Sequence, residues 1–160
     1  MGDSTVAVGD STVAVGAPTV LARPATEEVR RALARPAMEE VRRALALGGL
    51  IEITTIGRKT GLPRRIPIAL HSIAGRLFIS GMPSRRRRSW LANLAADPRL
   101  TVHVRRGVRT DLPATARVIV EEAERRAILA HVARAWRRDD VETMVRYSPL
   151  IEVTLDTLAA

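Results

Sequence analysis

The pattern of apolar and polar residues changes at Leu50. From Leu50 onward, short runs alternate apolar and polar positions and are rich in β-branched side chains, which is typical of strands with one buried face. Two longer segments, 89–98 and 121–138, have helical spacing instead. Short, mostly antiparallel strands with two intervening helices indicate a small barrel rather than a doubly wound sheet. We predict strands at residues 50–56, 64–72, 76–81, 100–106, 114–120 and 149–155.

The two helical segments differ in the signals they carry. Ser89 is expected as the N-cap of segment 89–98, and Pro98 is expected to end it. Segment 121–138 is amphipathic. Its core-facing side chains are expected to be small and apolar, namely Ala123, Ala127, Ile128, Ala130, Val132 and Ala135.

Two tandem duplications precede this region. GDSTVAV occurs at 2–8 and again at 9–15, and ARPATEEVRRAL at 22–33 is followed by ARPAMEEVRRAL at 34–45. A period of twelve residues with two copies is too short and too few for a solenoid array. We therefore interpret both duplications as local.

The domain organisation follows from these shifts in pattern. Residues 1–21 are small, polar and repetitive, and we expect them to be disordered. Residues 22–47 are expected to form helical pieces separated at Pro36, whose ring cannot continue a helix. Gly48 and Gly49 would end the second piece. Residues 48–160 would then form one globular domain.

Composition excludes several kinds of site. The chain has no cysteine, so disulfides and thiolate metal sites are excluded, and its three histidines (His71, His103, His131) are too scattered to favour a metal site. Hydrophobic residues make up 46%, yet no apolar run is long enough to span a membrane. The N-terminus lacks the pattern of a secretory signal, so we expect a cytoplasmic protein.

The net charge of +9 is concentrated in one part of the chain. Residues 57–109 hold thirteen Arg or Lys and a single acid, Asp97, and the remaining residues are net acidic. A concentration of positive charge of this kind attracts an anion. The chain has only two Trp, one Tyr and one Phe, which disfavours a nucleic-acid binder that stacks bases but leaves contacts to phosphate alone open.

The densest part of this charge is TTIGRKTGLPRRIPI at 54–68. Arg58, Lys59, Arg64 and Arg65 fall within eight positions of a predicted strand–turn–strand, and no acid lies near to neutralise them. A phosphate or carboxylate is best bound by guanidinium groups and turn amides. No Gly-x-Gly-x-x-Gly follows a predicted strand, so a Rossmann nucleotide site is not supported.

This segment and SWLANLAADPRLTVHV, about thirty residues later, together resemble the deazaflavin-dependent nitroreductase family of actinobacteria. The resemblance covers residues 50 to about 120 and extends more loosely to the C-terminal helix and strand. It implies an α+β, mainly β fold, the split β-barrel of flavin-binding oxidases, in a monomer or homodimer. It also implies binding of coenzyme F-420, a deazaflavin with a phosphate and an oligoglutamate tail. The reduced cofactor would pass hydride to a quinone, nitro compound or enone.

The resemblance assigns roles to residues of this sequence. The phosphate and tail would be held by Arg58, Lys59, Thr60, Arg64 and Arg65. The strand end that lies along the ring would be Ile66, Pro67, Ile68 and Ala69. The pocket would be completed by Phe78, Ile79, Ser80, Gly81, Ser89, Trp90 and Asn93.

Two features depart from that family. The run Arg85 to Arg88 makes the region before segment 89–98 more basic, and it could equally be a cofactor contact or a solvated loop. The better-known nitroreductases place several tyrosines near the substrate, whereas here Tyr147 is the only candidate for a proton donor or substrate contact. Two alternatives remain, namely a flavin mononucleotide binder and a non-catalytic or nucleic-acid-associated basic protein on the same scaffold. Deazaflavin supplies the hydride itself, so the absence of a paired-carboxylate or Ser-His-Asp constellation does not argue against an enzyme.

Overall fold

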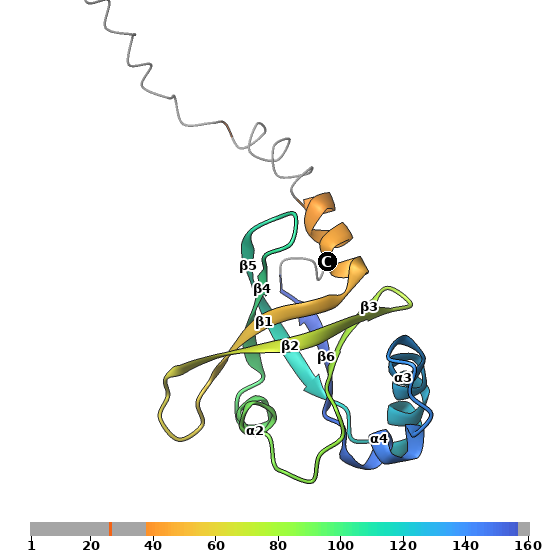
Figure 1. The fold of residues 1–160 in the computed structure, drawn as a ribbon. Coiled ribbons are helices and arrows are strands. Elements are labelled where there is room, and N and C mark those ends of the chain that lie inside the picture. The colour runs from red at the N-terminus through yellow and green to blue at the C-terminus, as the bar shows by residue number, and fades with distance from the viewer. Residues whose placement is uncertain (1–25, 27–37, 157–160) are drawn as a thin grey trace, which may run out of the picture.

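The computed structural model describes residues 26 and 38–156, and the other residues are the grey trace in Figure 1. The expected disorder of residues 1–21 and the expected break at Pro36 lie outside the described residues. Residues 38–47 are helical, as predicted for the second twelve-residue copy. Gly48 and Gly49 follow with φ of +63° and +96°, a left-handed backbone that favours glycine, and the helix ends there as expected.

A closed antiparallel barrel forms the body of the molecule (Figure 1), which confirms the predicted fold class. Around the barrel the strands follow the order β1-β2-β3-β6-β5-β4, and β4 pairs with β1 to close it. The observed strands match the predicted ones within a few residues. Their bounds are β1 Gly49–Ile56, β2 Pro63–Ile73, β3 Arg76–Ser80, β4 Arg99–Val104, β5 Thr110–Val118 and β6 Leu150–Leu155.

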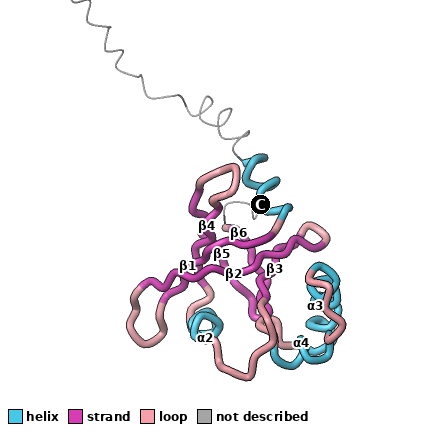
Figure 2. The backbone as a smooth tube through the Cα atoms, viewed as in Figure 1, coloured by secondary structure: helices cyan, strands magenta, loops and turns pink. Residues whose placement is uncertain are grey.

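Besides the helix at 38–47, three further described helices lie outside this barrel, and Figure 2 shows α3 and α4 together at one side and α2 at one end. They are α2 (Ser89–Ala96), α3 (Glu122–Ala135) and α4 (Val141–Tyr147). The sequence predicted α2 and α3 but missed α4. The expectation that Ser89 is an N-cap was wrong, because Arg88 occupies the cap position and no side chain caps the helix.

The apolar side chains form two cores. The first fills the barrel, and the helical residues Val41 and Leu45 close it at one end. The second lies between α3, α4 and the outer side of β3, where Phe78 is buried against Leu129 and Met144.

The predicted face of α3 was partly wrong. Ile128 and Val132 are buried as expected, whereas the alanines expected at 123, 127 and 135 are exposed. Leu129 and Ala133 are buried instead, so the core-facing stripe is rotated relative to the one inferred from the small residues. Packing against α4, which the sequence did not predict, accounts for this rotation.

Candidate functional site

The turn between β1 and β2 is held by its own backbone. Gly57 N–H donates to the Leu62 carbonyl (2.8 Å), and Gly61 N–H donates to the Gly57 carbonyl (2.7 Å). The Thr60 hydroxyl accepts a hydrogen bond from Leu62 N–H (3.2 Å). A Cβ at Gly57 would lie 2.7 Å from Thr60 Oγ1 and 3.2 Å from the Leu62 carbonyl oxygen, so glycine lets the turn close without displacing either group. Thr60 therefore shapes the turn, and the turn projects Lys59 into solvent.

Asn93, buried at 4% exposure, ties this turn to α2 and to the barrel. Its Oδ1 accepts hydrogen bonds from Arg58 N–H and from Arg58 Nη1, each at 3.1 Å. Its Nδ2 donates to the hydroxyl of Thr55, which is fully buried in β1 (3.3 Å). The position of Arg58 is therefore set by a residue 35 positions later in the chain.

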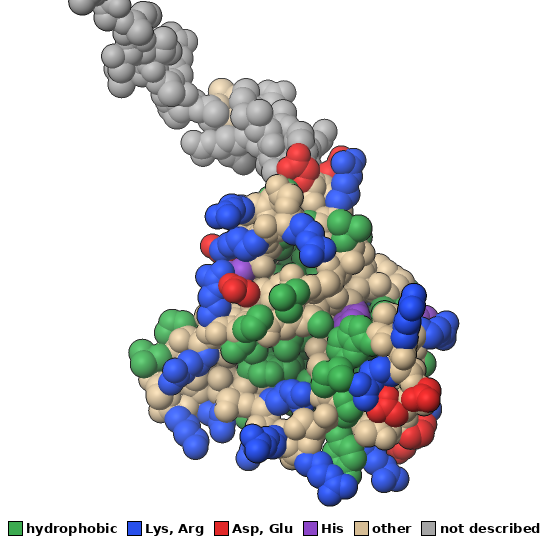
Figure 3. Space-filling view, in the orientation of Figure 1, with side chains coloured by type: hydrophobic (Ala, Val, Ile, Leu, Met, Phe, Trp, Pro, Cys, Tyr) green, Lys and Arg blue, Asp and Glu red, His purple; other side chains and the backbone are tan. Residues whose placement is uncertain are grey.

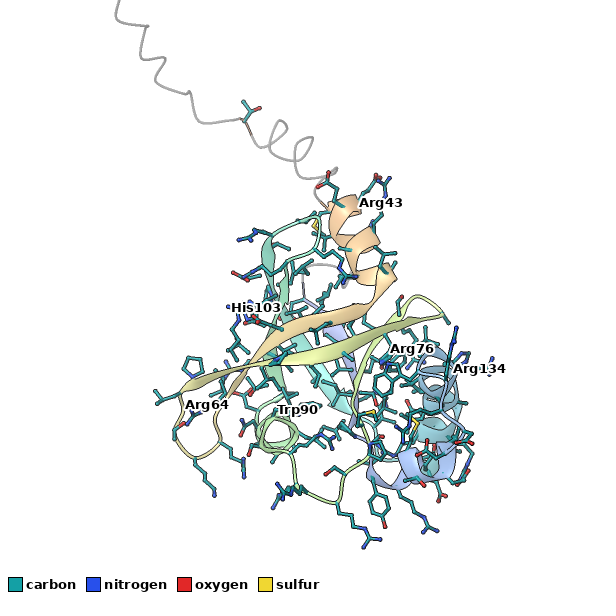
Figure 4. All side chains as sticks on the ribbon, viewed as in Figure 1. Arg43, Arg64, Arg76, Trp90, His103 and Arg134 are labelled. Atoms are coloured by element: carbon teal, nitrogen blue, oxygen red, sulfur yellow. The ribbon has the colours of Figure 1, made fainter. Side chains whose placement is uncertain are left out.

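The N-terminus of α2 has no side-chain cap and no acid in its first turn. Its first backbone amides are left for another partner, and the helix dipole favours an anion beside them. The β1–β2 turn brings Arg58 to Asn93 on this helix, and the run Arg85 to Arg88 leads directly into its N-terminus. Figure 4 places Arg64 on the hairpin and Trp90 on the neighbouring α2.

We use the name cationic rim for Arg58, Lys59, Arg64 and the run Arg85 to Arg88. Within residues 38–156, no carboxylate lies within ion-pair distance of any member of this rim. Figure 3 shows Lys and Arg side chains along the lower edge of the molecule, below hydrophobic side chains that gather under β2. The rim is therefore a positively charged border beside an apolar surface.

Arg65 differs from the rest of the predicted basic set. Its Nε contacts Glu52 Oε2 on the neighbouring strand, so the expectation that no acid neutralises this group was wrong for Arg65. Glu52 pairs with Pro67 and therefore lies diagonally across from Arg65, within reach of a long side chain. The two residues are 13 positions apart in the sequence, and no local pattern predicted this contact.

The loop from Gly81 to Arg88 is fastened to the end of α4. Ser84 N–H donates to the Tyr147 carbonyl (3.0 Å), and the Arg85 guanidinium lies 5.3 Å from the centre of the Tyr147 ring. Arg88 Nη2 donates to the Met82 carbonyl. Burial lowers the pKa of Arg88, although an arginine remains charged at any physiological pH. The loop thus holds its basic side chains between α2 and α4.

A cleft of about 1050 Å³ lies between α2 and α4. Leu91 and Ala92 of α2 and Val118 of β5 supply apolar surface. Arg85 to Arg88 and Tyr147 also line it. A cleft of this size, mostly apolar with a few polar groups, is typical of a site for a ring-containing small molecule.

The predicted site residues fall into three groups. Arg58, Lys59 and Arg64 lie with Ser89, Trp90 and Asn93 at the turn and α2, and Gly81 begins the adjoining loop. Ile66 and Ile68 pack against the barrel core, and Pro67 and Ala69 border other cavities, of about 300 and 710 Å³. Phe78 and Ile79 are buried at 1% and 0% exposure, and the buried Ser80 hydroxyl donates to the Pro149 carbonyl (2.8 Å). The structure thus brings only the first group to one surface.

Several residues of this region were not singled out by the sequence. Arg146 and Ser148 line the cleft because α4 ends beside it, and α4 itself was not predicted. Arg125 donates to the carbonyls of Val145 (2.9 Å) and Ile119 (2.8 Å) and so fixes the wall of the cleft. The only feature of the sequence that could have pointed to Arg125 was the positive charge of α3, and that charge does not distinguish a buried arginine from a solvated one.

Two other kinds of feature are absent from the part of the chain that the structure describes. No group of three or more His, Cys, Asp or Glu there could hold a metal ion. None of the described helices has the length and apolar character needed to cross a membrane.

Comparison with known proteins gives a family and a fold. A family model described as F420H(2)-dependent quinone reductase matches residues 19–155. A conserved hypothetical protein from Mycobacterium tuberculosis has a similar structure, with a TM-score of 0.57 and 16% identity over 74% of this chain and 79% of that chain. A candidate pyridoxamine 5′-phosphate oxidase from Listeria innocua gives a TM-score of 0.55 and 10% identity over 75% and 94%.

A further similar structure is an F420-H2 dependent reductase, FDR-A, with a TM-score of 0.49 and 25% identity over 66% of this chain and 93% of that chain. No curated protein sequence matches this chain. The structures from Mycobacterium tuberculosis and Listeria innocua show that the fold is a split barrel of the oxidase type.

Proposed function

Because this chain belongs to the F420H(2)-dependent quinone reductase family, we propose that it reduces a small organic acceptor with coenzyme F-420 as the hydride source. A quinone is the first candidate acceptor, and nitro compounds and enones are further candidates. The barrel with its flanking helices, residues 48–160, would be the cofactor-binding unit.

The observation that carries this proposal is the cationic rim beside an apolar cleft. F-420 combines a flat ring with a phosphate and several glutamate carboxylates. A rim whose cations have no acid partner among the described residues leaves its charge available for such a polyanion. Flavin mononucleotide has one phosphate and would leave most of the rim unpaired. The match in charge therefore supports F-420 over flavin mononucleotide.

Particular residues are suited to particular parts of the cofactor. Lys59 and Arg64 are exposed and free of side-chain partners among the described residues, so they would hold the tail. The uncapped amides at the start of α2 would hold the phosphate. Arg58 is already bonded to Asn93, so it would contribute its remaining guanidinium N–H groups. Trp90, half-buried on α2, would border the ring.

Reduction of a quinone to a hydroquinone consumes one hydride, which F-420 supplies when bound in its reduced form, and one proton. Tyr147 is the candidate proton donor because its side chain lines the cleft and carries a phenolic hydroxyl. Tyr147→Phe keeps the ring beneath Arg85 and removes only this hydroxyl. We expect kcat to fall by about a hundredfold, the lower end for general acid catalysis, with the dissociation constant of F-420 unchanged. An unchanged kcat would mean that solvent donates the proton.

A binding comparison tests the proposed cofactor. The protein is titrated with F-420, with flavin mononucleotide and with duplex DNA, each at low and at high salt. We expect F-420 to bind most tightly and to lose affinity at high salt, because exposed charges are screened over about 10 Å at 0.1 M salt. Tighter binding of flavin mononucleotide or of DNA would contradict the proposal.

A further inference from the structure

The cleft between α2 and α4 holds more positive charge than its own residues balance. Among the described residues, six arginines line it and the only acid is Glu122, whose carboxylate already accepts a hydrogen bond from Arg126 at 2.9 Å. An apolar ligand alone would leave these guanidinium groups without an anionic partner. The lining therefore favours a ligand that is both apolar and anionic.

The six arginines are not equivalent. Arg125 and Arg88 donate to backbone carbonyls and are partly buried, so they shape the cleft. Arg86 and Arg87 are exposed and have no acid partner among residues 38–156. Arg146 is exposed in the last turn of α4 and lines the same cleft. Guanidinium groups from the loop and from α4 can thus contact one ligand.

The cleft also offers an unsatisfied polar atom. Ser148 Oγ is buried and has no hydrogen-bond partner within the described part of the chain, and Ser148 lines the cleft beside Tyr147. A buried hydroxyl without a partner costs stability, so a ligand that supplies an acceptor or donor there would gain from it. Leu91, Ala92 and Val118 supply apolar surface for a ring.

We propose that this cleft binds the electron acceptor and selects acceptors in which an apolar ring carries an acidic group, such as a carboxylate or sulfonate. The inference rests on the proposed function, since it names the acceptor class of the same reaction. The cofactor tail and the acidic group of the acceptor would then lie on different sides of α2. Asn93 bonds to the β1–β2 turn, where the cofactor tail would lie, whereas Leu91, Ala92 and Ala95 line the cleft.

Direct binding to the protein without cofactor tests the cleft independently of activity. The probes are a fluorescent naphthalene sulfonate and the matched neutral naphthalene sulfonamide. In the Arg86→Glu, Arg87→Glu variant, we expect the dissociation constant of the sulfonate to rise by about tenfold or more, with little change for the sulfonamide. The control is Arg42→Glu, Arg43→Glu, which makes the same change in net charge at the far end of the barrel, where Figure 4 places Arg43. It should leave both constants unchanged.

Kinetics extend the test to the acceptor. With F-420 held at saturation, the same arginine variant should raise the KM of a naphthoquinone sulfonate by about tenfold and leave that of neutral menadione near the wild-type value. Equal weakening of both probes would overturn the inference, and so would weaker F-420 binding with unchanged sulfonate binding, because the cleft would then belong to the cofactor. Arginine-dependent sulfonate binding without reduction of either quinone would support the cleft and contradict the proposed function.

Discussion

Arg76 of β3 and Arg117 of β5 are exposed, as most arginines of the cationic rim are, yet within residues 38–156 only Arg76 and Arg117 of these have acid partners. Arg117 donates to Glu152 (3.0 Å) and to Glu124 (3.2 Å), and Arg76 contacts the same Glu152. These contacts lower the pKa of Glu152, with the hydrogen bond from Arg76 as the largest cause. No such partner exists for the rim within residues 38–156.

The difference shows that an arginine of this protein has or lacks a carboxylate partner according to the part of the surface on which it lies. On the outer side of β3, β5 and β6, next to α3, arginines and carboxylates alternate and neutralise each other. Around the N-terminus of α2, like charges lie together and repel, which stabilises nothing in the protein alone. A polyanionic ligand removes that repulsion, and this is the physical basis of the proposed function.

The largest expected effect comes from breaking the link between the rim and the barrel. Asn93→Leu removes the acceptor for Arg58 and the donor for the buried Thr55 hydroxyl. Leaving buried polar groups unsatisfied should lower the free energy of unfolding by about 2–4 kcal/mol. It should also weaken F-420 binding because the turn loses its position. Urea denaturation and a binding titration measure the two effects.

Ser89→Ala is the matched control on the same helix. Ser89 is exposed and its side chain makes no capping hydrogen bond, so its replacement should change stability by less than about 0.5 kcal/mol. A loss of about 1 kcal/mol or more would mean that Ser89 caps α2 after all.

A smaller effect is expected on the paired side. Arg117→Met keeps the aliphatic stem and removes a guanidinium that contacts two glutamates, with about half of the side chain exposed. Exposed ion pairs contribute about 0–1 kcal/mol, so the loss of stability should fall in that range. F-420 binding should not change. Weaker F-420 binding would contradict the distinction between the two sets of arginines.

The smallest effect should appear only in acid. Hydrogen bonds from His103 and then Arg105 lower the pKa of Asp111 from 3.8 to about 2. A carboxylate whose folded pKa is depressed stabilises the fold above its unfolded value and loses that contribution as the pH falls through 3.8 toward 2. Asp111→Asn should therefore lower the urea midpoint near neutral pH, and the gap from wild type should close within that window.

Asp139→Asn provides the control for this comparison. Asp139 is exposed and has no hydrogen-bond or ion-pair partner among the described residues, so its removal should leave the urea midpoint unchanged at both neutral and acidic pH. A gap for Asp111→Asn that widens in acid would contradict the assigned direction of the pKa shift.

The sequence was sufficient for the barrel because each strand carries its own alternation and its own turn residues. It was insufficient for α4, where VETMVRY offers only seven residues, about two turns, too few for a clear helical period. Without α4, the buried face of α3 could not be assigned, since Leu129 faces a helix that was not predicted. The end of α3 was also misplaced, because Arg137 adopts φ of +54° and turns the chain before Arg138.

For the site, local motifs identified the charge but not its partners. The glycines of GRKTG indicated a tight turn, and the structure has one. The roles of Asn93 and Glu52 depend on contacts across 35 and 13 residues, which no local pattern encodes. Phe78 carried no signal to show that its side of β3 is covered by α3 and α4, and it is buried there.

The proposal that the cationic rim holds the F-420 tail is tested most directly by the affinity of F-420 for the variant Lys59→Glu, Arg64→Glu. This affinity is compared with that of wild type and of the charge-matched variant Arg42→Glu, Arg43→Glu. Lys59 and Arg64 are exposed and make no ion pair among the described residues, so stability should stay within about 1 kcal/mol of wild type. The F-420 dissociation constant should rise by about tenfold or more, while that of the deazaflavin lacking phosphate and glutamates should not change. An F-420 affinity equal to wild type in a folded variant would show that the rim is a solvated surface and that the account of this site is wrong.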